Sequence, residues 1–170
     1  PFHLLFFSLS FQTFQVFNLN LFFHYSLGGI FTFIYLYKFV KLQKYSAFLG
    51  SIVFMLCGWM ISSMQHINAT SVALYFPLNL LLIEKYFNLK KESTTKVYLS
   101  KLVGLGSAFT IAIFFQLSIG HVETAYHNIL FAAIYFLIRL TLNKKFKEQI
   151  LLKLTVLIFA VITAILLYAP

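Results

Sequence analysis

Seven long apolar runs fill most of this 170-residue chain and restrict its fold more than any other feature. The runs cover residues 2–17, 20–40, 45–65, 69–87, 98–119, 122–141 and 150–169. A helix needs roughly 20 apolar residues to cross a hydrocarbon core about 30 Å thick, and the last six runs meet or approach that length. Helices also satisfy every backbone polar group within lipid. We therefore predict an all-α, polytopic membrane helix bundle with six to seven transmembrane helices, in which residues 1–170 form a single transmembrane domain.

The composition supports a membrane protein. Only 10% of the residues are charged, and the mean hydropathy is +0.87, whereas soluble domains average about 25% charged residues. The net charge of +9 would indicate a nucleic-acid partner in a soluble protein. Here the basic residues flank apolar runs, so we expect membrane lipids and other membrane subunits as partners and no nucleic acid.

The basic residues cluster around three of the six connections between the runs. They are Lys38, Lys41 and Lys44 near the second connection, Lys85, Lys90, Lys91, Lys96 and Lys101 near the fourth, and Arg139, Lys144, Lys145, Lys147 and Lys153 near the sixth. Short basic connections face the cytoplasm, or the matrix in a mitochondrial protein. We therefore predict an integral membrane location with these three connections inside.

With that orientation, four of the five histidines fall at the outer face, together with one acidic residue, Glu123. Three polar pairs spaced four residues apart stand out, because residues with this spacing share one face of a helix. The pairs are Asn20 with His24, Ser62 with His66, and Glu123 with His127. We expect these pairs to converge on one polar site at the outer face.

Three converging imidazoles indicate a metal site. Catalytic zinc commonly has three protein ligands and one open position, and it lowers the pKa of its bound water to about 7. We predict that His24, His66 and His127 bind zinc. We also predict that Glu123 and Ser62 belong to the catalytic site beside the metal, where a carboxylate orients a ligand or acts as general base.

The segment Ser62-Ser63-Met64-Gln65-His66 resembles the SxxxH element of the CREST superfamily of membrane hydrolases, which includes alkaline ceramidases, adiponectin receptors and haemolysin-III-like proteins. Asn20 and His24 are similar to the early Asn/His element of the adiponectin receptors, and His127 is similar to a late histidine of the family. The resemblance implies a zinc-dependent hydrolase of lipid amides or esters. The chain departs from the family pattern because it contains no aspartate and has Phe131 four residues after His127.

A second interpretation stays open beside the hydrolase. The chain would then be a non-catalytic structural, lipid-binding or haem-binding subunit of a larger membrane complex. Two facing histidines suffice to ligate haem, and His66 with His127 would be the pair.

Two further features predict helix geometry. Pro77 lies inside the fourth run and is expected to kink it. Small residues allow helices to approach closely within membranes. The small residues expected to mark helix contacts are Gly28, Gly29, Gly104, Gly106 and Ser107.

Overall fold

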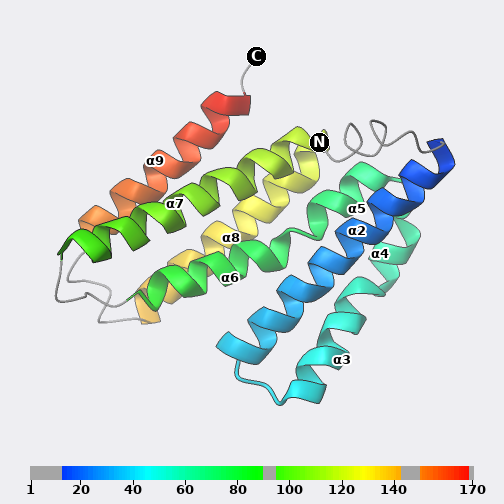
Figure 1. Ribbon diagram of the computed structural model, residues 1–170, viewed down its shortest axis with the longest axis horizontal. Coiled ribbons are helices and arrows are strands. Elements are labelled where there is room, and N and C mark those ends of the chain that lie inside the picture. Colours follow the sequence, from blue (N-terminus) through cyan, green and yellow to red (C-terminus); the bar gives the residue numbers. More distant parts are fainter. Residues whose placement is uncertain (1–12, 90–94, 143–149, 169–170) are drawn as a thin grey trace.

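The computed structural model describes residues 13–89, 95–142 and 150–168, which form a helical bundle (Figure 1). The helices are α2 (Thr13–Ile34), η1 (Tyr35–Phe39), α3 (Lys44–Met55), α4 (Gly58–Ser62), α5 (Ile67–Ala73), α6 (Phe76–Phe87), α7 (Thr95–Ser118), α8 (Val122–Leu142) and α9 (Ile150–Tyr168). No strand occurs in these ranges. The predicted all-helical class is confirmed.

Five helical spans in the described ranges are long and apolar enough to cross a membrane. They are Gln15–Phe39, Lys44–Ser62, Ile67–Phe87, Lys96–Ser118 and Val122–Leu142, while Leu152–Tyr168 is a shorter apolar helix. These spans support an integral membrane protein. The structure gives five of the six to seven predicted transmembrane helices, and residues 2–12 of the first predicted run lie outside the described ranges.

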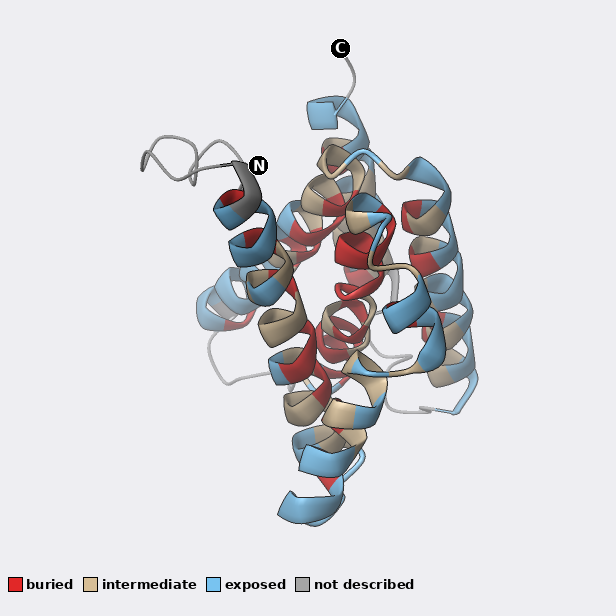
Figure 2. Ribbon diagram, turned by 90° about the vertical axis from the view of Figure 1, so that its right-hand side faces the viewer, coloured by how far each residue is buried: buried red, intermediate tan, exposed pale blue. Residues whose placement is uncertain are grey.

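The span formed by α5 and α6 lies in the middle of the bundle. In its most apolar stretch 72% of the residues are buried, against 17–33% in the other four candidate spans. Figure 2 shows the buried residues gathered on the inward faces of the helices. Helices α2, α7 and α8 pack against the central span, α3 packs against α2, and α9 packs against α7. The central span therefore contributes most to the buried interior of the bundle.

The predicted connection at residues 18–19 is wrong. Helix α2 runs without interruption from Thr13 through these positions and continues into η1, a π-helical turn that ends at Phe39. Asn18 and Asn20 do not break the helix, because an asparagine costs only about 0.7 kcal/mol in a helix interior, far less than proline. The end of the first predicted run therefore belongs to the same helix as the second.

The fourth predicted run is interrupted, as Pro77 indicated. Helix α5 ends at Ala73 and α6 begins at Phe76, so the break falls at Leu74 and Tyr75. Pro77 lies in the first turn of α6, where a missing N–H group leaves no helical hydrogen bond unmade. The break lets this central span change direction inside the bundle.

Three of the four predicted glycine contacts are confirmed. A Cβ atom on Gly28 would lie 2.5 Å from Leu74 Cδ2, one on Gly29 would lie 2.4 Å from Met55 Sδ, and one on Gly106 would lie 2.8 Å from Val156 Cγ1. The prediction for Gly104 is wrong, because a Cβ atom there would meet no atom within 4 Å.

The connections separate into two ends of the bundle, as the charge pattern predicted. Figure 1 shows the connection at 40–43 and the C-terminal ends of α6 and α8 toward the lower left. The connections at 63–66 and 119–121 lie toward the upper right. We call the first the basic end, because the lysines of η1 and α3, those at the end of α6 and the start of α7, and Arg139 are found there.

Candidate functional site

His24 lies inside the bundle. It is 2% exposed, and its ring packs edge-on against Phe23 and against Tyr75, with centroids 6.0 Å and 5.7 Å away. The described part of α2 begins at Thr13, so His24 lies about 16 Å along the helix axis from that residue. The second predicted run, which begins at residue 20, implied that His24 lies in the first turns of a helix, and this is wrong.

Ser62 and His66 do not share a helical face. Helix α4 ends at Ser62, a turn follows, and His66 precedes the first residue of α5. Both side chains are exposed. The Ser62 hydroxyl donates a hydrogen bond to the backbone carbonyl of Trp59 at 3.0 Å, which is a local helix-end contact.

The residues around the start of α8 do share one helix, but they have separate roles. Glu123 and His127 are exposed, and His127 lines a shallow pocket with Trp59 and Phe131. Glu123 occupies the first turn of α8, where the helix dipole favours a negative charge. The Nδ1 atom of His121 accepts a hydrogen bond from the backbone N–H of Thr124 at 3.3 Å, so His121 caps this helix.

The structure does not bring the three predicted zinc ligands together. His24 is buried beside Tyr75, whereas His66 and His127 are exposed at the opposite end from the lysines. In the part of the chain that the structure describes, no three His, Cys, Asp or Glu residues form a group that could hold a metal ion. The zinc site, with Glu123 and Ser62 as its catalytic partners, stays a prediction from the sequence.

A charged cluster joins α6 and α8 near the basic end. Glu84 is 5% exposed. Arg139 contacts both oxygens of the Glu84 carboxylate, with Nε 2.6 Å from Oε1 and a terminal nitrogen 2.9 Å from Oε2. The Tyr135 hydroxyl donates to the same carboxylate at 2.5 Å. The Tyr35 hydroxyl in turn donates to Tyr135 at 3.2 Å. This chain of bonds ties η1, α6 and α8 together.

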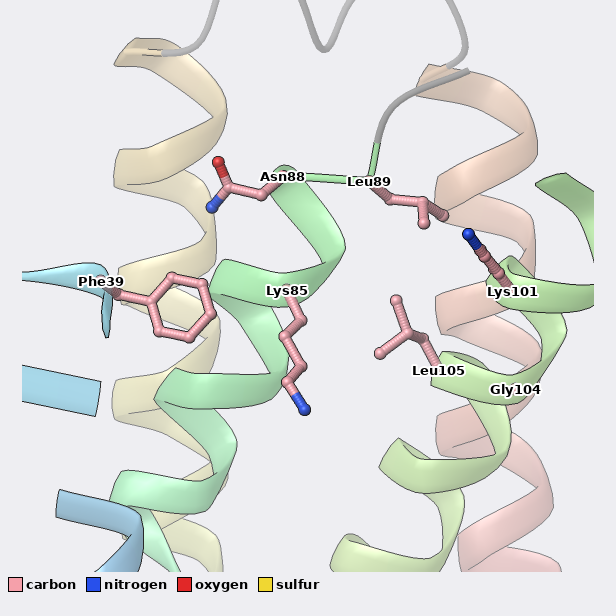
Figure 3. Close-up of a pocket in the computed structure, with 7 residues that line it drawn as sticks. All are labelled: Phe39, Lys85, Asn88, Leu89, Lys101, Gly104 and Leu105. Carbon is pink, nitrogen blue, oxygen red and sulfur yellow. The ribbon is translucent and has the colours of Figure 1, made fainter. Parts of the chain in front are cut away.

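A pocket of about 570 Å³ lies beside this cluster at the basic end. Its lining consists of Phe39, Lys85, Asn88, Leu89, Lys101, Gly104 and Leu105 (Figure 3). Figure 3 shows Lys85 and Leu105 extending into the space between α6 and α7, with Lys101 directed from α7 toward Leu89. The pocket therefore combines two ammonium groups from different helices with apolar side chains.

The electrostatics of the pocket favour an anion. A cleft lined by charges of one sign raises the local concentration of the opposite ion. Glu84 is the acidic residue next to Lys85 in the chain, but both of its carboxylate oxygens are engaged by Arg139. Asn88 also donates to the Glu84 backbone carbonyl at 2.8 Å. The Glu84 carboxylate is thus engaged by a residue of α8.

A cluster of three amide side chains is buried where α6, α7 and α8 meet. Gln116 and Asn79 exchange two hydrogen bonds, at 3.2 Å and 3.1 Å. Asn128 donates to Gln116 Oε1 at 3.2 Å and to the backbone carbonyl of Val72 at 2.8 Å. All three side chains are at least 93% buried, so the amides bond to one another in place of water.

The sequence did contain a signal for the charged cluster. Arg139 is the only arginine of the chain, and Glu84 is the only acidic residue inside any predicted run near the basic end. Ionisable residues within membrane spans usually pair with one another, and arginine suits bidentate pairing with a carboxylate. The pocket between α6 and α7 had no comparable signal, because it depends on how two helices cross.

The chain matches no family model, no curated protein and no solved structure. Its function is therefore inferred from the geometry of its own residues.

Proposed function

We propose that the protein is a non-catalytic integral membrane protein that binds an anionic phospholipid in the pocket between α6 and α7. The observation that carries this proposal is the presence of Lys85 and Lys101, from two helices, in one pocket with Phe39, Leu89 and Leu105. Basic pockets between transmembrane helices on the cytoplasmic or matrix side bind the head groups of anionic lipids. The lysines would hold the phosphate, and the leucines would contact the acyl chains.

The position of the pocket supports this ligand. It lies at the basic end of the bundle, where the positive-inside rule places the cytoplasm or matrix. The cytoplasmic leaflet carries the anionic lipids, and each lysine near its surface contributes about 1 kcal/mol to lipid attraction. Two lysines would thus favour an anionic over a zwitterionic lipid by about tenfold to thirtyfold.

Native mass spectrometry of the protein with added lipid tests this proposal. We expect phosphatidylglycerol to remain bound more often than phosphatidylcholine, and the double variant Lys85→Gln/Lys101→Gln to lose that preference. The control Lys38→Gln/Lys96→Gln removes the same charge from exposed lysines that do not line the pocket, and it should keep the preference. Equal retention of the two lipids by the unmodified protein would refute the proposal.

The zinc-dependent hydrolase and the haem-binding subunit stay predictions from the sequence. Elemental analysis for zinc and a visible absorption spectrum of the purified protein test both. Stoichiometric zinc in the unmodified protein that is lost in His66→Ala and in His127→Ala would support the hydrolase prediction. A Soret band would favour haem.

A further inference from the structure

A second cavity, of about 320 Å³, lies among α6, α7, α8 and α9, and its lining contains no lysine. Its walls are apolar side chains, such as Ile83, Phe109, Phe136 and Leu157, with one exception, Asn79. Leu137 of α8 belongs to the lining and is 58% exposed on the outside of the bundle. In a membrane this outer surface faces hydrocarbon, so a ligand would enter from the lipid.

Asn79 is held in a fixed orientation by its neighbours. The side-chain nitrogen of Gln116 donates to the Ala112 carbonyl at 3.0 Å and to Asn79 Oδ1 at 3.1 Å, which uses both of its hydrogens. The Gln116 oxygen accepts from Asn79 and from Asn128. The oxygen and nitrogen of Asn79 are thereby assigned without ambiguity.

This arrangement leaves Asn79 with hydrogen-bonding capacity at the cavity. A primary amide has two donor hydrogens and two acceptor positions on its oxygen. Its reciprocal pair with Gln116 uses one of each, so one donor and one acceptor remain on a side chain that is 3% exposed. The reciprocal pair occupies the side of the amide where its N–H and its oxygen lie close together, so the remaining donor and acceptor point in different directions. A hydroxyl group can accept from the one or donate to the other.

We propose that this cavity binds a neutral, lipid-soluble alcohol whose hydroxyl pairs with Asn79 and whose hydrocarbon part fills the apolar walls. At about 30 Å³ for each non-hydrogen atom, the volume of a water in the liquid, the cavity holds roughly ten such atoms. A charged ligand is disfavoured, because the lining offers no opposite charge to offset its desolvation. This site uses residues that do not line the anionic lipid pocket and does not depend on that proposal.

Photolabelling of the full chain in phosphatidylcholine nanodiscs tests this site. The probe is a seven-carbon alcohol in which one chain carbon belongs to a diazirine, and the competitors are 1-nonanol and decane. All three molecules have equal numbers of non-hydrogen atoms. We expect the label on the peptides of α6 and α8 that line the cavity. At equal concentration in the bilayer, 1-nonanol should compete about fivefold to tenfold better than decane, the ratio that one net hydrogen bond provides.

Three variants distinguish labelling inside the cavity from labelling on the lipid-facing surface of the protein. Asn79→Leu should reduce the ratio between the two competitors to about one, while Ala132→Phe should fill the cavity and remove the label. Ile134→Phe adds the same ring on the exposed face of α8 and should change nothing. The Ala132 variant leaves the three amides intact, so it decides the question if Asn79→Leu does not fold. Equal competition by 1-nonanol and decane in the unmodified protein, or undiminished labelling of Ala132→Phe, would overturn the proposal.

Discussion

At the scale of single residues, the pairing of Glu84 with Arg139 is the contact whose loss should cost most. Removing one partner of a fully buried ion pair costs about 3–5 kcal/mol. The Arg139 side chain is 29% exposed, so we expect Glu84→Gln to lower the free energy of unfolding by about 2 kcal/mol. Denaturant-induced unfolding in mixed micelles measures this change.

Glu123→Gln is the matched control, because Glu123 is an exposed carboxylate at the other end of the bundle. Its effect should stay within about 0.5 kcal/mol. The double variant Glu84→Gln/Arg139→Gln should lose less stability than the sum of the two single variants, since residues in one network are coupled. Additive losses would mean that the two side chains do not interact.

The residue scale also shows how far the sequence could predict the polar sites. The spacing of Asn20 with His24 correctly placed two side chains on one face of α2, and both are buried. The same spacing misled for Ser62 and His66, because a turn separates them. Spacing gives a shared face only where the helix is continuous, and continuity around residues 56–66 could not be read from an apolar run.

At the scale of elements, one glycine of α7 fixes the approach of α9. Gly106→Leu should lower the thermal midpoint in detergent by several degrees, because its first side-chain carbon would already lie 2.8 Å from Val156 Cγ1. Overpacking of this kind typically costs about 1–3 kcal/mol. Differential scanning fluorimetry provides the comparison.

Gly104→Leu serves as the control, since it makes the same substitution on the same helix where a Cβ atom meets nothing within 4 Å. Its thermal midpoint should equal or exceed that of the unmodified protein, because leucine has the higher helix propensity. Gly104 also lines the basic pocket, so this variant should retain less phosphatidylglycerol while remaining folded. Equal losses of stability in both variants would contradict the close packing of α7 on α9.

The elements themselves were largely predictable. Length and hydropathy predicted the bounds of four runs that agree with the observed spans to within a few residues. The exception is α2, where polar residues between two apolar runs suggested a connection although the helix continues. Asparagine is a poor marker of a helix end without proline or glycine beside it, and a single apolar-to-polar change cannot distinguish a loop from a polar helical turn.

At the scale of the whole molecule, the separation of charge predicts the orientation in the membrane. In a background with Cys57→Ser, a cysteine at Leu42 should be shielded from an impermeant thiol reagent added outside. Cysteines at Gln65 and Asn68 should be labelled. All three positions are exposed, so burial in the protein does not explain a difference. Labelling at Leu42 together with protection at Gln65 would reverse the orientation and place the basic pocket in the wrong leaflet for its proposed ligand.

The most direct measurement maps where an anionic lipid touches the protein. Phosphatidylglycerol with a photoreactive group near its glycerol would be crosslinked to the protein in a bilayer, and the modified residues would be identified by mass spectrometry. We predict that the modifications concentrate at Lys85, Leu89 and Leu105 and fall by about tenfold in Lys85→Gln/Lys101→Gln. Modifications spread evenly over exposed residues such as Phe159 and Ile165, with no change in the double variant, would contradict a specific lipid site.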